Sequence, residues 1–208
     1  MTGLEAEPAA VTELFGDRAD LARSFTERLA AVGEERGLIG PLELPRLWTR
    51  HVLNSALLAP LLRPGRVGDV GSGAGLPGIP LAIARPDVTL VLIEPMERRT
   101  DWLREEVARL GLDNVEVVRG RAQDVTADPP LDQVTARAVA SLAKLVPMLR
   151  PLLRSGGEMI LLKGARVDDE VAAAAKQLRA ARVRDPVVLV LGAGILPEET
   201  RVFRATVD

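Results

Sequence analysis

The segment that most constrains the fold is a glycine-rich loop after a short apolar strand. It runs from Asp69 to Gly78 with the sequence DVGSGAGLPG, and a helical pattern follows it. Glycine lets the backbone turn sharply and approach a ligand closely, and the N-terminus of the following helix favours polar or anionic groups. A strand, a glycine loop and a helix in this order predict the first unit of a ligand-binding α/β domain.

Two classes of cofactor site fit this loop. Its spacing matches the G-x-G-x-x-G pattern of dinucleotide sites, which is weak evidence on its own. An acid two positions before three alternating glycines, here Asp69, is instead typical of loops that bind S-adenosylmethionine near its cationic amino-acid part. Pro77 and Pro80 favour this second class, because proline lacks the N–H groups that a pyrophosphate would need. We therefore expect Asp69, Gly71 and Gly73 to contact S-adenosylmethionine.

Glu94 ends the next predicted strand, where a carboxylate can accept hydrogen bonds from both hydroxyls of a ribose. Because NAD sites share this feature, it does not separate the two classes of cofactor. A chain of 208 residues leaves no room for the substrate domain of a dehydrogenase. A nicotinamide-dependent oxidoreductase remains the alternative, and a cofactor-binding regulatory module without catalysis is a third hypothesis.

From Arg66 onward, segments of strand and helix character alternate. The expected strands are 66–71, 88–94, 115–119, 131–137, 158–163, 186–191 and 201–207, and the expected helices are 78–84, 96–110, 142–149 and 167–181. This alternation predicts a Rossmann-like α/β fold with a seven-stranded, mostly parallel sheet and helices on both faces. The loop 192–199 contains no helix, so we expect the last strand to be antiparallel.

The residues before this alternation are expected to form a helical cap. Apolar residues recur at helical spacing, predicting one helix that ends near Gly37 and a second that begins near Pro45, runs through Leu57 and is closed by Pro64-Gly65. We therefore divide the chain into an N-terminal helical extension, 1–63, packed on a methyltransferase domain, 64–208.

Composition excludes several classes of protein. The chain has no cysteine and one histidine, so neither a disulfide framework nor a zinc cluster of these residues is expected, and we expect no metal. The N-terminus has no signal-peptide character and no apolar run is long enough for a membrane helix, so we expect a cytoplasmic protein without membrane contact. A net charge of −2 does not by itself suggest nucleic acid.

The sequence VGSGAGLPGIPL, residues 70–81, resembles the signature of the small-subunit (16S) rRNA guanine-N7-methyltransferases, also called glucose-inhibited division protein B. Four further segments are similar to that family: Arg50–Ser55, Gly120–Gln123, Ala136–Ala138 and Leu162–Gly164. The similarity covers nearly the whole chain from about Gly37, and Gly40-Pro41 and Pro45–Trp48 resemble the actinobacterial branch.

The resemblance implies methyl transfer from S-adenosylmethionine to N7 of a guanosine in 16S rRNA, at conventional position 527 of the decoding-region loop, with a small-subunit particle as substrate. It implies cofactor contacts at Gly71, Leu76, Ala122, Gln123 and Arg137. Three features depart from the family pattern. The Asn-Leu pair usual before the second helix is absent, with Gly37-Leu38 nearby. Gln123 replaces a common acid, which leaves the binding of the adenine amino group open, and Asn54 replaces a frequent aspartate.

Cations are expected around the same cleft independently of the resemblance. Arg121, Arg137 and Lys163 lie at or just after the ends of parallel strands, and Arg201 begins the antiparallel strand at that edge. Together they predict a rim that contacts RNA phosphates and positions the substrate. His51 either touches the RNA or is a hydrogen-bonded structural residue beneath the cleft.

No catalytic general base is expected. Guanine N7 carries an unprotonated lone pair, so it loses no proton before it attacks a methyl group. The enzyme's task is then to align the reacting atoms.

Overall fold

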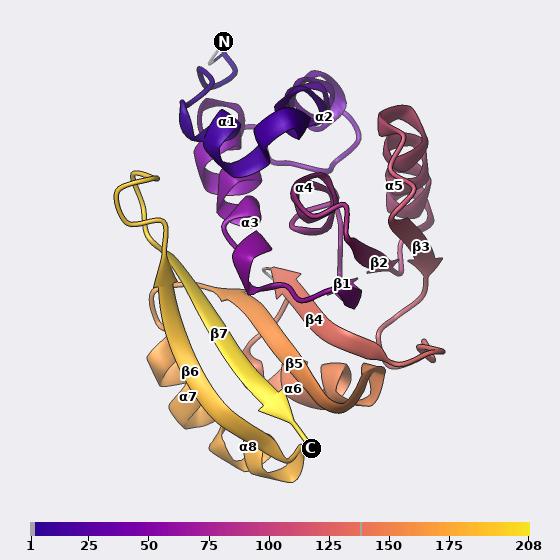
Figure 1. The fold of residues 1–208 in the computed structure, drawn as a ribbon, viewed down its shortest axis with the longest axis vertical. Helices are drawn as coiled ribbons and strands as arrows, with labels where there is room; N and C mark the ends of the chain where they lie inside the picture. The colour runs from indigo at the N-terminus through magenta and orange to yellow at the C-terminus, as the bar shows by residue number, and fades with distance from the viewer. Residues whose placement is uncertain (1–2, 138) are drawn as a thin grey trace.

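The strands form one mixed sheet in the computed structural model, which describes residues 3–137 and 139–208. The strand order is β3-β2-β1-β4-β5-β7-β6 (Figure 1). The strands are β1 (Gly65–Val70), β2 (Val88–Glu94), β3 (Val115–Arg119), β4 (Leu131–Arg137), β5 (Leu153–Lys163), β6 (Val183–Leu191) and β7 (Thr200–Val207). β1 to β5 pair in parallel, whereas β7 lies antiparallel between β5 and β6. The predicted Rossmann-like α/β class, with its seven-stranded sheet and antiparallel last strand, is confirmed. Ala138, which ends the matching segment Ala136–Ala138, lies outside the described residues.

Helices precede the sheet and connect its strands. Their bounds are α1 (Ala10–Phe15), η1 (Gly16–Arg18), α2 (Ala19–Val32), η2 (Leu44–Arg46), η3 (Leu47–Leu53), α3 (Asn54–Ala56), η4 (Ala59–Leu61), α4 (Gly78–Ala84), α5 (Glu97–Leu110), α6 (Leu142–Leu149), η5 (Arg150–Leu152), α7 (Val167–Ala173) and α8 (Ala175–Ala180). No helix in the described part of the chain is long and apolar enough to cross a membrane.

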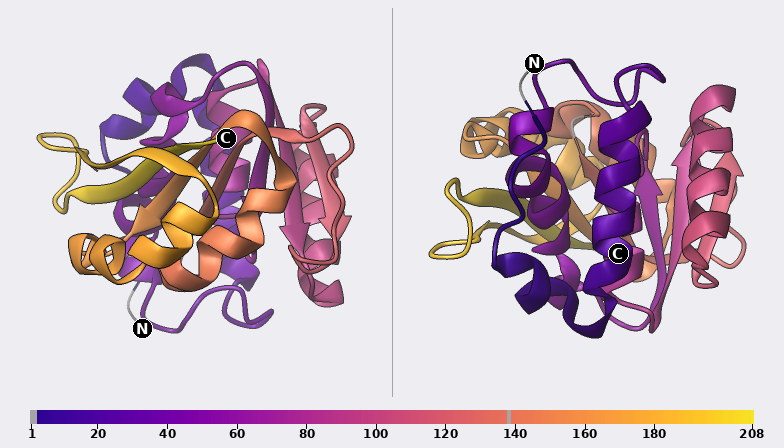
Figure 2. Two further views of the ribbon diagram at one scale, coloured as in Figure 1. Left: turned by 90° about the horizontal axis from the view of Figure 1, so that it is seen from below. Right: turned by 90° about the horizontal axis from the view of Figure 1, so that it is seen from above.

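Apolar side chains cover both faces of the sheet. In β2, Leu90 and Leu92 join the cluster formed with the N-terminal helices, α4 and α5, whereas Val91 and Ile93 join the cluster formed with α6 and α8. The N-terminal helices and α6–α8 accordingly lie on opposite sides of the sheet (Figure 2). Burial on both faces explains why β2 is an almost continuous apolar run.

The first long helix ends earlier than expected. α2 stops at Val32, and Leu38 and Ile39 both donate backbone hydrogen bonds to the carbonyl of Gly33, at 2.7 and 3.2 Å. A Cβ atom at Gly33 would lie 2.8 Å from Cγ1 of Ile39. The chain therefore turns back over Gly33, and the prediction of a helix end near Gly37 was wrong.

The segment expected to form one helix from about Pro45 is helical, but it is not one continuous α-helix. The chain instead forms η2, then η3, which is a π-helix, and then α3. A π-helix closes its hydrogen bonds over five residues, and such turns are frequent at functional sites. Leu47, Trp48 and Val52 are buried on η3, and an apolar pattern alone does not distinguish such a π-helix from an α-helix.

Further elements differ from their expected bounds, among them β6, which begins at Val183, and most clearly β5 and the helix after it. β5 begins at Leu153, which pairs with Leu131, and the register then shifts. Gly156 has φ 73°, so a residue type that usually marks a turn lies inside this irregular strand. The helix expected over 167–181 bends at the fully buried Ala174 and becomes α7 and α8.

Candidate active site

Two adjacent cavities lie at the carboxyl ends of the parallel strands. One, called here the glycine-loop cavity, has a volume of about 500 Å³ and is lined by Val70, Gly71, Ile93–Met96, Arg99, Gly120–Gln123, Arg137, Val139 and Met148. The other, called here the hairpin cavity, has a volume of about 730 Å³ and is lined by Arg50, His51, Asn54, Arg137, Val139–Ser141, Leu162–Ala165, Glu170 and Glu198–Arg201. Because Arg137 and Val139 line both, the two cavities share a wall.

The glycine loop is open at Gly73. This residue has φ 55°, a left-handed conformation that favours glycine, and its N–H donates to Oε2 of Glu94 at 2.9 Å. A Cβ atom here would have the carbonyl oxygen of Gly71 and Nη1 of Arg99 as its nearest neighbours, at 3.7 and 3.9 Å. The loop therefore has space on this side that a ligand can use.

Glu94 is held by two backbone groups beside this space. Its Oε2 accepts from Gly73, and its Oε1 accepts from the N–H of Met96 at 2.9 Å. The side chain is buried yet lines the cavity, and each carboxylate oxygen keeps a second lone pair. Two fixed acceptors side by side suit the two hydroxyls of a ribose.

Asp69 lies beneath the glycine loop and is not among the residues that line the cavity. It is fully buried, and its Oδ2 accepts from the N–H of Gly78 at 3.0 Å. Among the described residues, Oδ1 has no hydrogen-bond partner. Burial raises the pKa of Asp69 to about 7. In this position the carboxyl group holds the first turn of α4 to the end of β1.

The other expected cofactor residues likewise either line the glycine-loop cavity or are buried away from it. Gly71, Ala122 and Gln123 line the glycine-loop cavity, as does Arg121. Leu76 is 5% exposed and packs in the core instead. Apolar side chains complete the lining: Met96, Val139 and Met148.

The expected cations are divided between the two cavities. Arg121 lines the glycine-loop cavity, Lys163 and Arg201 line the hairpin cavity, and Arg137 lines both. Lys163 and Arg201 are register partners across β5 and β7, which confirms that they share one edge of the sheet.

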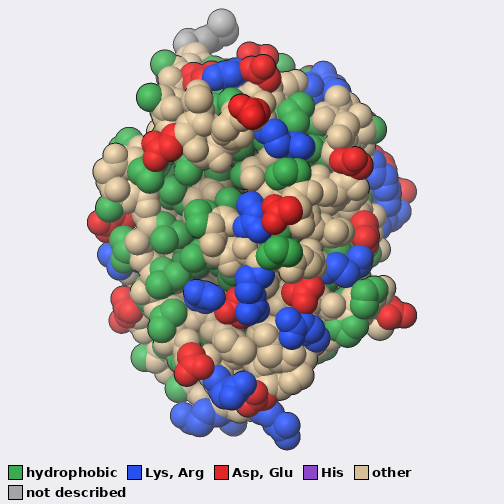
Figure 3. All heavy atoms as spheres, viewed as in Figure 1, with side chains coloured by type: hydrophobic (Ala, Val, Ile, Leu, Met, Phe, Trp, Pro, Cys, Tyr) green, Lys and Arg blue, Asp and Glu red, His purple; other side chains and the backbone are tan. Residues whose placement is uncertain are grey.

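The hairpin cavity is mixed in charge, not uniformly cationic. Nζ of Lys163 lies 2.6 Å from Oε2 of Glu170, and its side chain is 8% exposed. Glu198 and Glu199 also line this cavity, and Glu198 faces Arg50 at 3.7 Å. Charges of both signs are likewise interspersed over the molecular face in Figure 3. RNA phosphates would therefore compete with carboxylates that already face these cations.

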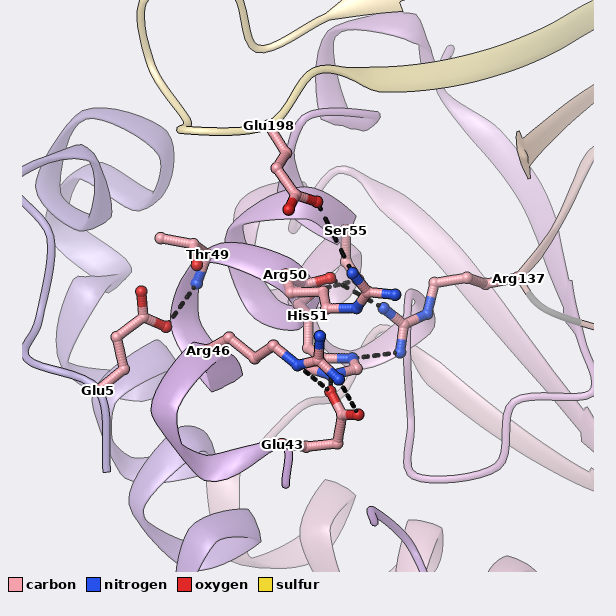
Figure 4. A network of polar contacts seen from close by, with 9 residues as sticks. All are labelled: Glu5, Glu43, Arg46, Thr49, Arg50, His51, Ser55, Arg137 and Glu198. Carbon is pink, nitrogen blue, oxygen red and sulfur yellow. Dashed lines mark hydrogen bonds and ion pairs between the residues drawn. The ribbon is translucent and has the colours of Figure 1, made fainter. Parts of the chain in front are cut away.

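His51 lies between an acid and Arg137 (Figure 4). Its Nε2 is 2.6 Å from Oε2 of Glu43, and its Nδ1 is 2.8 Å from Nη2 of Arg137. Because a guanidinium only donates, Nδ1 must accept and Nε2 must carry the proton. Burial and the charge of Arg137 lower the pKa of His51, although Glu43 opposes this shift. The structure thus places His51 in a hydrogen-bonded network at the edge of the hairpin cavity.

Several residues of this site were not predicted from the sequence. Glu43 lies in the irregular segment before η2, and the acidic pair Glu198 and Glu199 lies in the β6–β7 loop. Asn54, noted only as a departure from the family pattern, donates to Oγ1 of Thr200 at 2.5 Å. Charged residues in irregular segments carry no periodic pattern, so no sequence signal marked Glu43 or the acidic pair.

Residues 18–197 match the family model described as rRNA small subunit methyltransferase G. The chain belongs to this family. It is 65% identical over 204 residues to "Ribosomal RNA small subunit methyltransferase G" of Leifsonia xyli subsp. xyli, covering 98% of each chain. It is 52% identical to the protein of that name from Pseudarthrobacter chlorophenolicus, covering 98% of this chain and 94% of that one.

Solved structures agree with the fold. A SAM-dependent methyltransferase from Aquifex aeolicus has a TM-score of 0.53 at 18% identity, covering 98% of this chain and 100% of that one. M. jannaschii TYW2 in complex with AdoMet has a TM-score of 0.57 at 17% identity, covering 74% of each chain. As a member of the small-subunit rRNA family, the chain is an S-adenosylmethionine-dependent methyltransferase, and the oxidoreductase alternative is not supported.

Proposed function

We propose that this chain methylates N7 of a guanosine in 16S rRNA, at the position that the family resemblance implies, within the small ribosomal subunit in the cytoplasm. The observation that carries this proposal is the wall shared by the two cavities at Arg137 and Val139. S-adenosylmethionine in the glycine-loop cavity would present its methyl group toward a base in the hairpin cavity.

The residues of the glycine-loop cavity suit S-adenosylmethionine. Glu94 offers two acceptors to the ribose, and the open side of Gly73 leaves room for the ligand. Gly71, Ala122, Gln123 and Arg137 line the same cavity. Asp69 and Leu76 would contribute from beneath, by fixing the loop that carries these groups.

In the proposed reaction, the cofactor supplies an activated methyl group on a sulfonium. The protein aligns the base with that group, and such alignment can contribute about 7–11 kcal/mol to catalysis. No residue accepts a proton, because N7 has none to lose. A cation directly at N7 would oppose the positive charge that methylation places on the ring, so the arginines act on the RNA backbone.

RNA phosphates would contact the cations of both cavities. We assign Arg121 and Arg201 to phosphate binding, and Arg137 to both RNA and cofactor. Lys163 can join them only if it exchanges Glu170 for a phosphate. His51 takes part through Arg137.

Position mapping tests this function. Small subunits from cells that lack this protein are incubated with the protein and methyl-labelled S-adenosylmethionine, and the labelled nucleotide is mapped. We expect a single N7-methylguanosine in 16S rRNA. Label on another atom or another RNA would refute the proposal, and naked 16S rRNA as a parallel substrate tests the need for the particle.

A further inference from the structure

Arg137 lies where the donor and acceptor of the proposed transfer would meet, because its side chain lines both cavities. Its described hydrogen bonds run from Nη2 to His51 Nδ1 at 2.8 Å and from Nη1 to the carbonyl of Arg50 at 3.3 Å. Both acceptors belong to η3. The position of this guanidinium therefore depends on the N-terminal extension and not only on β4.

His51 can accept from Arg137 only in one protonation state. Nδ1 must be free of a proton, so Nε2 must carry it, and Glu43 lies 2.6 Å away to accept it. The second nitrogen of a histidine commonly fixes the role of the first in this way. The hydroxyl of Ser55 donates to the carbonyl of His51 at 2.6 Å, which also anchors the residue on its helix.

Glu43 is itself held in place. Oε2 and Oε1 accept from Nε and Nη2 of Arg46 at 3.0 and 2.7 Å. Burial alone would raise the pKa of Glu43, but the hydrogen bonds from Arg46 and His51 keep it below its usual range. The carboxylate is thus ionised at neutral pH and favours the Nε2–H form of His51.

We propose that Glu43 and His51 are positioning residues that set the Arg137 guanidinium in the wall between the two cavities. Glu43 selects the Nε2–H tautomer of His51. Nδ1 of the imidazole can then accept from Arg137, and this hydrogen bond fixes the orientation of the guanidinium. This inference rests on the proposed function, since it treats the shared wall as the place of methyl transfer. It also gives the N-terminal extension a role in the reaction.

Imidazole nitrogen NMR tests the tautomer directly. The chain has one histidine, so protein labelled with ¹⁵N-histidine gives one pair of ring nitrogen signals. At neutral pH we expect a protonated Nε2 and an unprotonated Nδ1. In Glu43→Ala and in Arg137→Ala, the signals should move toward a mixture of tautomers. A wild-type ring in the Nδ1–H form, or doubly protonated at neutral pH, would overturn the proposal.

Single-turnover methylation of small subunits tests the consequence. Glu43→Ala and His51→Ala should each lower the rate about ten-fold or more, because a hydrogen bond to a charged group fixes the guanidinium. Glu43→Gln keeps an acceptor for Nε2–H and should restore most of the rate. Glu13→Ala, an exposed acid on α1, is the matched control and should leave the rate unchanged.

A double-mutant cycle separates positioning from a merely structural role. In an Arg137→Lys background, adding His51→Ala should lower the rate less than about two-fold further, because the shared partner is already altered. Fully additive losses would overturn the proposal. Thermal unfolding of each variant shows whether it is still folded. Glu43→Ala tests the same link with less disturbance of the fold, because the side chain of Glu43 is 21% exposed. If wild-type protein methylates no small subunit, the proposed function fails, and the imidazole spectra still decide the network.

Discussion

The glycine-loop cavity and the hairpin cavity are built in different ways. The first lies against the glycine loop and contains one carboxylate, Glu94, which the backbone N–H groups of Gly73 and Met96 hold in place, with arginines and apolar side chains around it. The second uses long charged side chains from η3, β5, α7 and β7, and several of them already face a partner of opposite charge.

This difference predicts two kinds of binding. A cavity formed by fixed backbone groups loses little entropy on binding a small cofactor. In a cavity of paired charges, the cations must leave their carboxylate partners to bind the phosphates of the RNA. The affinity for RNA therefore falls as the salt concentration rises. Substitutions of the glycine loop and Glu94 should therefore act on cofactor affinity, whereas substitutions of the cations should act on RNA-dependent turnover.

The largest effect is expected for Gly73→Val. The branched side chain would occupy the open side of the loop and would have to adopt φ 55°. We expect S-adenosylmethionine affinity to fall at least about a hundred-fold by calorimetry, equivalent to roughly 3 kcal/mol. Nearly normal affinity would mean that the cofactor does not approach this side of the loop.

Glu94→Ala should weaken the same affinity by about ten- to a hundred-fold, because hydrogen bonds to a charged acceptor contribute roughly 1.5–3 kcal/mol. Glu97→Ala, an exposed acid at the start of α5, is a matched control. Equal affinities for the two variants would remove Glu94 from the cofactor site.

Arg121→Ala and Arg201→Ala should leave cofactor affinity nearly intact but lower turnover on small subunits. Each lost phosphate contact should also flatten the salt dependence of RNA binding by about one unit of slope. Lys163→Ala should in addition lower thermal stability, because it leaves Glu170 without its cation. The exposed Arg179→Ala serves as control. Full activity in all three cleft variants would contradict the phosphate-binding role.

The smallest effect is expected from pH. Since no general base acts, the single-turnover rate should stay nearly flat from neutral to mildly alkaline pH and fall only when His51 is protonated. The pKa of His51, which faces Glu43, Arg137 and Arg50, lies below its ordinary value of 6.5. The unfolded chain therefore takes up this proton first, so His51 favours folding above pH 6.5 and this contribution is lost at lower pH. A rate that rises log-linearly through neutral pH would instead require a titrating base.

The sequence alone determined the central architecture, and it predicted which loop binds the cofactor. The bounds of β2, β3 and β4 agree with prediction because apolar runs between turn residues are local signals. The position of Glu94 at the end of β2 was predicted from the same local signals. The division of the chain at residues 63 and 64 stays a prediction, and helices of both parts contribute to one apolar cluster.

Only the tertiary structure decided what the charged residues contact. It placed Asp69 beneath the loop, paired Lys163 with Glu170, and brought His51 to Arg137 across 86 positions of sequence. A pattern can assign a cation to an edge of the sheet, but an ion pair depends on distances of a few ångströms between distant segments. The distance between His51 and Arg137, for example, is set by how η3, a π-helix without a sequence signature, packs against the end of β4.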